Sequence, residues 1–317
     1  MIITFVDVDL VSPAMIGGPN PRALDTPPSL RAPSVRGSLR FWTRALAGDR
    51  APTEVESELW GSIERGQGIG LFPGTPLPAG QRVILFPAKE TERERSATPA
   101  IALDQSARIR FRLPDTDHLH ALAAVVWTWL HLGTLGRRGR RGYGSLLWRP
   151  VANDLLQRAG FPILRREEVL ASRSSLSEYL GTGLVEVRKR FGVPDAKATR
   201  TTHPYFRLDS LDQIFVGRRL NATYDGTVDG MEHRLHGRDP DRRGTAKKEM
   251  GSALGERLAS PMAWRVFPAC GGGYFPVLTW SPVEHTEVDP RSAMHTYLSD
   301  LGFTTSLTGR SLSAAAP

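Results

Sequence analysis

The order of strand and helix patterns over residues 2–149 constrains the fold more than any other feature of this sequence. Residues 2–10 alternate between two faces, which is the period of a strand. The patterns that follow are a helix over 33–48, strands over 82–88 and 107–113, an apolar helix over 117–133 and a short strand over 145–148. The order strand, helix, strand, strand, helix, strand predicts a ferredoxin-like unit that ends near residue 150.

The second half of the chain is less regular. A helix is expected over 176–191, strand-like runs over 205–217, a hairpin over 263–281 and a last helix over 291–302. The polar, charged stretch 220–250 predicts a long loop. We therefore expect an α+β fold with an N-terminal domain over 1–150 and a C-terminal domain over 151–317 that carries this insertion.

The segment 135–146, LGRRGRRGYGSL, has the composition of a loop that lets a nucleic-acid backbone come close. Its glycines permit positive φ and lack the Cβ that would keep another backbone at a distance. Its arginines carry planar donors that match phosphate oxygens, and Tyr143 offers a face on which a base can stack. The alternatives are a solvated basic loop, and a Tyr143 that packs beneath it.

A second basic feature lies on the first predicted helix. Arg36, Arg40 and Arg44 are four residues apart and form a stripe beside the apolar face. Gly37 is unfavourable in a first turn, unless a ligand approaches the helix N-terminus, which attracts anions. The stripe is otherwise a solvated face with ion pairs. Gly17 and Gly18 either shape a loop next to this site or only turn the chain, and Trp42 is expected in the core.

The composition favours a polyanionic partner and an intracellular setting. The chain of 317 residues has a formal net charge of +8 and a pI of about 10.0. Cys270 is the single cysteine, so no disulfide or cysteine-based zinc site can form within one chain. No signal peptide is evident, and the most apolar stretch, 121–132, is too short to span a bilayer. We expect a soluble, cytoplasmic protein with no membrane partner.

Several motifs resemble those of a known family. Residues 12–46 resemble the N-terminal signature of the RAMP proteins of CRISPR systems. Within them, 33–42 (PSVRGSLRFW) resembles the opening of the first-numbered subunit of the Cmr (type III-B) RNA-guided effector complex. Residues 59–62 (LWGS) stand where that family has an LFG turn, the arginine- and glycine-rich loop ends like the RAMP Gly-rich loop, and 257–261 (RLASP) resembles a motif of the second half.

The resemblance implies two ferredoxin-like, RRM-related domains in tandem, with Gly-rich loops, that bind RNA without catalysis. It places the subunit where the 3′ region of the guide RNA lies. The implied partners are guide (CRISPR) RNA, target RNA and the other Cmr subunits, and no cofactor or metal is expected. The residues expected to bind RNA are Arg36, Gly37, Arg40, Arg44, Gly17, Gly18, Arg137, Arg138, Gly139, Arg140, Arg141, Gly142 and Tyr143.

Catalytic interpretations find less support. Asp7 and Asp9 share a strand face as paired acids of a metal nuclease would, but no third acid is evident. The histidine pairs, interpreted as structural or as loop residues, are His118 with His120 and His233 with His236. The alternative function is a metal-independent ribonuclease that processes repeat RNA, with His203 or His120 as general base. A DNA-binding regulator, with a helix-turn-helix over 244–260, is a third interpretation.

Overall fold

The computed structural model describes most of the first half of the chain and parts of the second. The described residues are 1–17, 23–25, 27–64, 66–72, 74, 77, 80–84, 97–192, 206–220, 223–228, 231, 262–281, 298–299 and 302–309.

The first half contains the predicted ferredoxin-like unit. Its elements are β1 (Ile2–Leu10), α1 (Ala32–Ala45), β4 (Gly70–Phe72), β7 (Ser106–Leu113), α3 (Asp117–Leu132) and β8 (Leu146–Arg149). The sheet has the order β4-β7-β1-β8, and all its neighbouring strands are antiparallel. The connections from β1 through α1 to β4, and from β7 through α3 to β8, each skip one strand, which is the split βαβ arrangement.

The second strand of this unit is not the one predicted. We expected 82–88, but the edge strand is β4, where Leu71 pairs with Phe111 and enters the core. The strand β5 (Gly80–Ile84) instead pairs with β6 (Ala97–Ile101) in a separate two-stranded sheet. Between α1 and β4 lie α2 (Pro52–Trp60) and the paired short strands β2 (Gly61–Ser62) and β3 (Gly66–Gln67).

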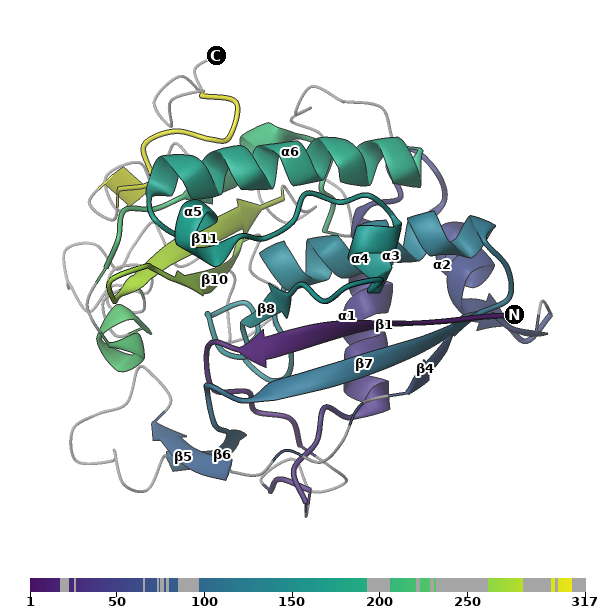
Figure 1. Cartoon of the computed structure of the whole chain (residues 1–317), viewed down its shortest axis with the longest axis horizontal. Helices are drawn as coiled ribbons and strands as arrows, with labels where there is room; N and C mark the ends of the chain where they lie inside the picture. The colour runs from purple at the N-terminus through teal and green to yellow at the C-terminus, as the bar shows by residue number, and fades with distance from the viewer. Residues whose placement is uncertain are drawn as a thin grey trace, which may run out of the picture.

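One face of the first sheet is covered by helices and the other is open. The apolar sides of α1 and α3 pack on Val6 and Val8 of β1, and these residues form the main core. In Figure 1 both helices lie behind the sheet, and the opposite face of β1 and β7 is turned to the viewer. The helices therefore leave a second sheet face for polar and charged side chains.

The second half repeats part of this arrangement. Its elements are α4 (Leu155–Arg158), α5 (Arg166–Val169), α6 (Arg173–Phe191), the 3₁₀ turn η2 (Leu211–Gln213), β9 (Ile214–Val216), β10 (Met262–Pro268) and β11 (Tyr274–Trp280). The sheet order is β10-β11-β9, and Phe215 of β9 also bridges to Ser306. Helical residues 224–228 lie between β9 and β10 in the chain, and helical residues 298–299 follow β11. The order in which these strands pair is the same as in the first sheet. A complete second ferredoxin-like domain stays a prediction.

Three second-half predictions can be compared with these elements. The predicted helix is α6, and the predicted hairpin is β10 with β11, joined through Gly271, Gly272 and Gly273, all at positive φ. Residues 224–228 are helical, with Tyr224 and Val228 buried, so this part of the 220–250 stretch is not a loop. The structure does not describe 232–261, where the rest of that stretch falls.

The two halves share a packed boundary. Helix α6 lies along α3, and the approach is close because Gly183 has no side chain: a Cβ there would lie 1.9 Å from the Trp127 ring. Leu155 and Leu184 join the same core as the first sheet. The domain boundary near residue 150 stays a prediction, and α4 and α6 pack with the elements before it.

Candidate nucleic-acid interface

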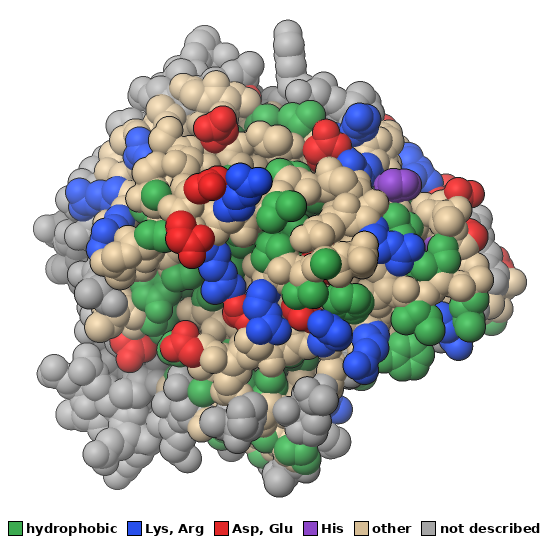
Figure 2. All heavy atoms as spheres, in the orientation of Figure 1, with side chains coloured by type: hydrophobic (Ala, Val, Ile, Leu, Met, Phe, Trp, Pro, Cys, Tyr) green, Lys and Arg blue, Asp and Glu red, His purple; other side chains and the backbone are tan. Residues whose placement is uncertain are grey.

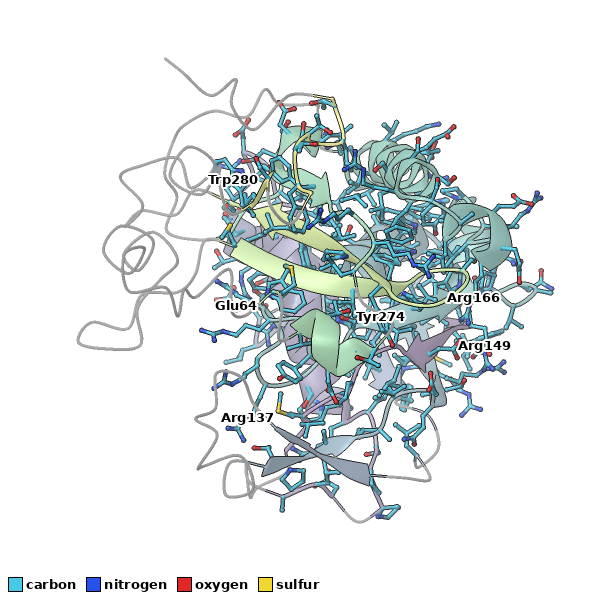
Figure 3. All side chains as sticks on the ribbon, turned by 90° about the vertical axis from the view of Figure 1, so that its left-hand side faces the viewer. Glu64, Arg137, Arg149, Arg166, Tyr274 and Trp280 are labelled. Atoms are coloured by element: carbon cyan, nitrogen blue, oxygen red, sulfur yellow. The ribbon has the colours of Figure 1, made fainter. Side chains whose placement is uncertain are left out.

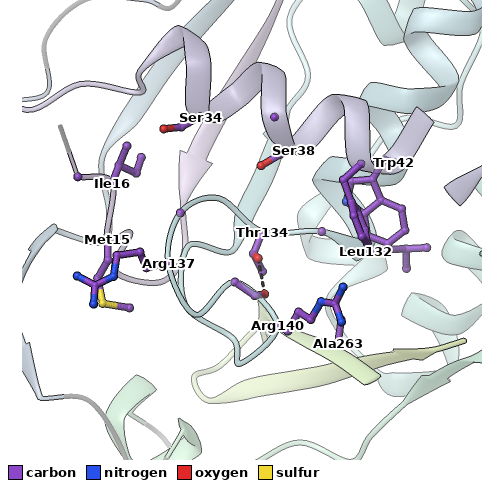
Figure 4. Close-up of a pocket in the computed structure, with 16 residues that line it drawn as sticks. Met15, Ile16, Ser34, Ser38, Trp42, Leu132, Thr134, Arg137, Arg140 and Ala263 are labelled. Carbon is purple, nitrogen blue, oxygen red and sulfur yellow. Dashed lines mark hydrogen bonds between the residues drawn. The ribbon is translucent and has the colours of Figure 1, made fainter. Parts of the chain in front are cut away.

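An open groove of about 540 Å³ lies where three sequence motifs meet. The loop after β1, the first half of α1 and the Gly-rich loop after α3 form its walls (Figure 4). The lining residues from the predicted site are Gly17, Gly37, Arg137, Gly139 and Arg140. Segments that are far apart in the sequence thus converge on one surface.

The N-terminal half of α1 forms one wall and has the features of an anion site. Pro33 occupies the first turn, which contains no acidic residue, and no side chain caps the helix. The first backbone N–H groups of a helix have no intrahelical partner and carry the positive end of its dipole. Ser34 and Ser38 lie on the side of α1 that faces the groove (Figure 4).

Gly37 opens this wall of the groove. A Cβ at Gly37 would have no heavy atom within 4 Å, so the protein itself does not require glycine there. A glycine inside a helix costs about 1 kcal/mol relative to alanine. The empty space in front of Gly37 belongs to the groove, so it is available to a ligand.

The loop after β1 is held against this helix. The Nη1 of Arg31 donates to the Gly17 carbonyl at 2.7 Å, and its Nε forms an ion pair with Asp25 at 2.8 Å. Gly17 also bridges to Leu24. The loop is therefore fixed where it enters the groove. Gly18, the other glycine predicted for the site, lies outside the described residues.

The Gly-rich loop forms the opposite wall, and its glycines serve the protein's own packing. Gly142 and Gly144 have φ of 77° and 69°. A Cβ would lie 2.2 Å from the Trp264 ring at Gly142, and 1.9 Å from the Leu135 carbonyl at Gly144. At Gly139 it would lie 2.4 Å from the Thr134 hydroxyl. We expected these glycines to admit a nucleic-acid backbone, but the neighbours they admit are side chains and backbone of this chain.

The loop is joined to the second-half sheet. The Gly142 N–H donates to the Trp264 carbonyl at 3.0 Å, and the Trp264 N–H donates to the Arg140 carbonyl at 3.2 Å. The loop therefore extends the edge of β10, and its backbone shape depends on the second half of the chain.

Arg265 lies beneath the loop and anchors both of its ends. Its guanidinium is fully buried and donates to the Leu130 carbonyl at the end of α3 and to the Leu146 carbonyl at the start of β8. It also lies 4.2 Å from the centre of the Phe267 ring. Burial lowers the pKa of Arg265 to about 9. Sequence analysis missed this residue, although a lone arginine in the apolar run AWRVF was a usable signal.

The four loop arginines occupy different environments. Arg137 and Arg138 are exposed, Arg138 with a φ of 55°, and Arg141 is half-buried. The guanidinium of Arg140 lies over two adjacent rings, 5.6 Å from the centre of Phe41 and 5.7 Å from that of Phe206, and burial lowers its pKa. Figure 4 shows Arg137 at the Met15 end of the groove and Arg140 at the Ala263 end.

Two aromatic residues near the groove belong to the core. Tyr143 is only 2% exposed and contacts Tyr224 edge to face at 6.1 Å, so it packs beneath the loop and offers no face to a base. Trp42 is 3% exposed, as expected for a core residue, although one side of it borders the groove.

The arginine stripe on α1 is partly neutralised by one acid. Arg40 and Arg44 both form ion pairs with Glu56, a buried carboxylate on α2. This is the alternative of a face with ion pairs, and Glu56 was not singled out from the sequence. Arg36, one turn closer to the helix N-terminus, makes no ion pair within the described part of the chain.

The acids considered for catalysis are held by arginines. Asp7 accepts two hydrogen bonds from Arg108, at 2.7 and 2.9 Å, and one from Arg149 at 3.4 Å. Asp9 accepts from Ser106 and Arg166. No group of three metal-ligating side chains occurs among the residues that the structure describes.

The histidines considered for catalysis are not in the groove. His118 contacts Asp115 at 2.7 Å, and His120 is exposed in the first turns of α3. The groove lies beyond the last turn of this 16-residue helix, about 20 Å from its start. His203, His233, His236 and the segment 244–260 lie outside the described residues.

The sequence of the first half matches a known protein superfamily. Residues 7–146 match the RAMP superfamily, which confirms the resemblance drawn from the motifs. Two relatives, both from Pyrococcus furiosus, are subunits of one CRISPR system by name. The CRISPR system Cmr subunit Cmr1-1 is 24% identical over 151 residues, and Cmr1-2 is 25% identical over 175 residues. The matches cover 42% and 44% of this chain, and 44% and 91% of the respective relatives.

Solved structures share the fold over nearly the whole chain. The apo crystal structure of Pyrococcus furiosus Cmr1 gives a TM-score of 0.60 at 18% identity and covers 91% of both chains. A chain from the cryo-EM structure of the type III-B Cmr-beta, bound to cognate target RNA and AMPPnP, gives a TM-score of 0.60 at 10% identity. It covers 94% of this chain and 99% of that one. Among the described helices, none has the length and apolarity needed to cross a membrane.

Proposed function

We propose that this protein is a non-catalytic, RNA-binding subunit of a type III-B (Cmr) CRISPR effector complex, which holds the 3′ region of the guide RNA or its duplex with target RNA. The RAMP match, the Cmr1 relatives and the shared fold support membership of such a complex. The net charge of +8 supports an RNA partner.

The observation that carries the proposal is the groove in front of Gly37. An uncapped helix N-terminus, the exposed Arg137 and the half-buried Arg140 meet there around empty space. Helix N-termini and arginines are the groups that proteins place around phosphate oxygens. These donors grip a backbone without reading bases, as a subunit must when base pairing with the guide supplies the specificity.

The ribonuclease alternative has weaker support. RNA cleavage without metal needs a general base within hydrogen-bond reach of the 2′-hydroxyl. No histidine of the described part of the chain lines the groove, and His120 is at the other end of α3. The acids Asp7 and Asp9 are bound by arginines. A purified chain that cleaves repeat RNA without metal would nevertheless establish that alternative.

The substitution Gly37→Ala tests the proposal directly. Alanine should stabilise α1 by about 0.5–1 kcal/mol, because nothing in the protein blocks its methyl group. The same methyl group should obstruct the groove and weaken single-stranded RNA binding by about tenfold, as a loss of one or two phosphate contacts would. Thermal unfolding and fluorescence anisotropy with labelled repeat RNA measure the two effects.

Gly181→Ala is the matched control. Gly181 lies inside α6, and a Cβ there also meets nothing within 4 Å. Alanine at this position should stabilise its helix to a similar degree and leave RNA affinity unchanged. Equal RNA affinity of the Gly37→Ala and Gly181→Ala variants would remove the groove from the RNA-binding surface.

A further inference from the structure

The open face of the first sheet carries apolar side chains, of which Ile3 and Phe72 are exposed, and arginines that the groove does not use. Alternate residues of β1 and β7 point away from the helices: Ile3, Phe5 and Asp7 on β1, and Arg108, Arg110 and Arg112 on β7. The edge strand β4 adds Phe72. Ile3 is 68% exposed and Phe72 is 50% exposed. Large exposed apolar side chains beside a basic row mark an interaction surface.

The strand register places these groups in a single line. Phe5 of β1 lies opposite Arg110 of β7, and Arg110 lies opposite Phe72 of β4. With neighbouring strands about 4.8 Å apart, the backbones of Phe5 and Phe72 are about 10 Å apart, and Arg110 lies on the strand between them. Arg110 makes no ion pair in the described part of the chain.

On this face, a buried carboxylate holds a planar guanidinium group over an aromatic ring. Asp7, which the groove does not involve, accepts both hydrogen bonds of the Arg108 guanidinium. That guanidinium lies 4.1 Å from the centre of the Phe5 ring. At the other end of the line, the Arg112 guanidinium is 5.9 Å from the Phe72 ring. Planar guanidinium groups and aromatic rings are the surfaces on which unpaired bases stack.

This face is separate from the groove. Figure 2 shows basic side chains across the region of β1 and β7, with hydrophobic side chains beside them. Figure 3 shows Arg149 and Arg166, which pair with the acids of β1, on the side of the molecule opposite Arg137. A ligand on the sheet face therefore does not occupy the groove.

We propose that this sheet face, defined by Phe5, Phe72, Arg108, Arg110 and Arg112, is a second binding surface for single-stranded RNA. Bases stack on Phe72 and on the Arg108 guanidinium that covers Phe5, and Arg110 holds a phosphate between them. The Phe72 ring and the Arg108 guanidinium on either side of Arg110 match the alternation of bases and phosphates along a single strand, and this match favours RNA over a protein partner. A duplex, whose bases are already stacked, gains nothing from the ring and the guanidinium.

The test measures binding of the full chain to a labelled 12-nucleotide oligouridine and to the same strand paired with oligoadenosine. Phe72→Leu keeps an apolar side chain and removes the ring, so it should weaken single-strand binding about tenfold. Phe72→Tyr, which keeps the ring, should bind like the wild type. Neither variant should change duplex binding by more than about twofold.

Control variants distinguish base stacking from non-specific apolar contact and from the effect of charge. Ile3→Ala removes the most exposed apolar side chain of the same face without touching a ring, and should leave affinity unchanged. Arg110→Ala should flatten the dependence of log affinity on log salt by about 0.7. Lys189→Ala removes an exposed cation from α6 and should leave that slope unchanged.

The two RNA surfaces can be tested apart. In a Gly37→Ala background, Phe72→Leu should weaken single-strand binding by the same factor as in the wild type, whatever the effect of Gly37→Ala itself. Wild-type RNA affinity for both Phe72→Leu and Arg110→Ala would overturn the sheet-face proposal and leave the groove untouched. Loss of a neighbouring subunit from the assembled complex in these variants, with RNA affinity retained, would overturn it in favour of a protein contact.

Discussion

The arginine stripe on α1 and the arginines of the Gly-rich loop have the same side chain, but their surroundings differ. On α1, Arg40 and Arg44 are held by the buried carboxylate of Glu56. Around the loop, the buried ionised group is itself a cation, Arg265, and its partners are backbone carbonyls. Glu56 therefore offsets one of the two positive charges of Arg40 and Arg44, whereas Arg265 adds a buried positive charge beneath the loop.

This difference predicts that the basic residues of the two regions would contribute unequally to RNA binding. The stripe is regular in sequence, yet the acid that neutralises it comes from a separate helix. The loop is irregular, yet its position in space is fixed at both ends by one buried side chain. The pattern of charge in the sequence indicates where a polyanion could bind. The buried ionised groups that pack against these arginines decide how strongly the protein itself holds them.

The largest expected difference between the two regions concerns their buried ionised groups. Arg265→Met leaves the Leu130 and Leu146 carbonyls without their donor, so we expect the free energy of unfolding to fall by about 3 kcal/mol. Glu56→Gln keeps the shape of the side chain beside two partly exposed arginines and should cost about 1 kcal/mol or less. Urea unfolding monitored by tryptophan fluorescence measures both. Equal losses would mean that the loop is no more dependent on its anchor than the stripe is on Glu56.

Lowering the pH should reduce the free energy of unfolding, because His131 is buried at the end of α3 that precedes the Gly-rich loop. This residue lies in the last turn of α3, donates from Nδ1 to the Trp127 carbonyl at 2.7 Å and accepts from the Tyr179 hydroxyl at 2.9 Å. Burial lowers the pKa of His131 to about 3, whereas an unfolded histidine titrates near 6.5. Below pH 6.5 the unfolded chain therefore takes up a proton that the folded chain does not.

The stability that neutral His131 provides is complete above pH 6.5 and is lost progressively between pH 6.5 and about 3. We expect a loss of about 2 kcal/mol at pH 5. His131→Phe, which cannot titrate, should flatten the fall in unfolding free energy between pH 7 and pH 5. His120→Gln, which removes an exposed histidine from the same helix, should keep the wild-type slope. A slope for His131→Phe that matches the wild type would contradict this assignment.

The smallest effect concerns the surface arginines themselves. Arg36→Ala with Arg137→Ala should weaken single-stranded RNA binding about tenfold and flatten the salt dependence by about 1.4, because each removes one phosphate contact. Arg40→Ala with Arg44→Ala should change affinity by less than about threefold, because the carboxylate of Glu56 already holds both guanidinium groups. Anisotropy titrations over a series of salt concentrations compare the pairs. Equal effects would mean that the ion pairs with Glu56 do not lower the contribution of Arg40 and Arg44.

Much of the first half could be predicted because its elements are long and periodic. The strand β1, the helices α1 and α3, and the inward and outward alternation of β7 follow directly from apolar spacing. The strand β4 did not, because only three residues form it and β7 alone defines it as a strand. In the second half, residues 224–228 looked polar enough for a loop, and burial of Tyr224 and Val228 makes them a helix.

The candidate site could be predicted in part. The motifs around Gly17, Gly37 and Arg137 were each recognised, and the structure brings them to one groove. The neutralisation of Arg40 and Arg44, the burial of Tyr143 and the anchoring by Arg265 could not be predicted. Each depends on a partner in another element, and a single sequence does not specify such pairings.

The anchoring of the Gly-rich loop also sets the time at which it can form. Arg265 follows Leu146 by 119 residues and Leu130 by 135 residues in the chain. At ordinary rates of protein synthesis this separation corresponds to on the order of ten seconds. During that interval the nascent chain already displays the loop arginines, but the strand that shapes the loop does not yet exist. The Gly-rich loop can therefore reach its final conformation only after both halves have been synthesised and have folded together.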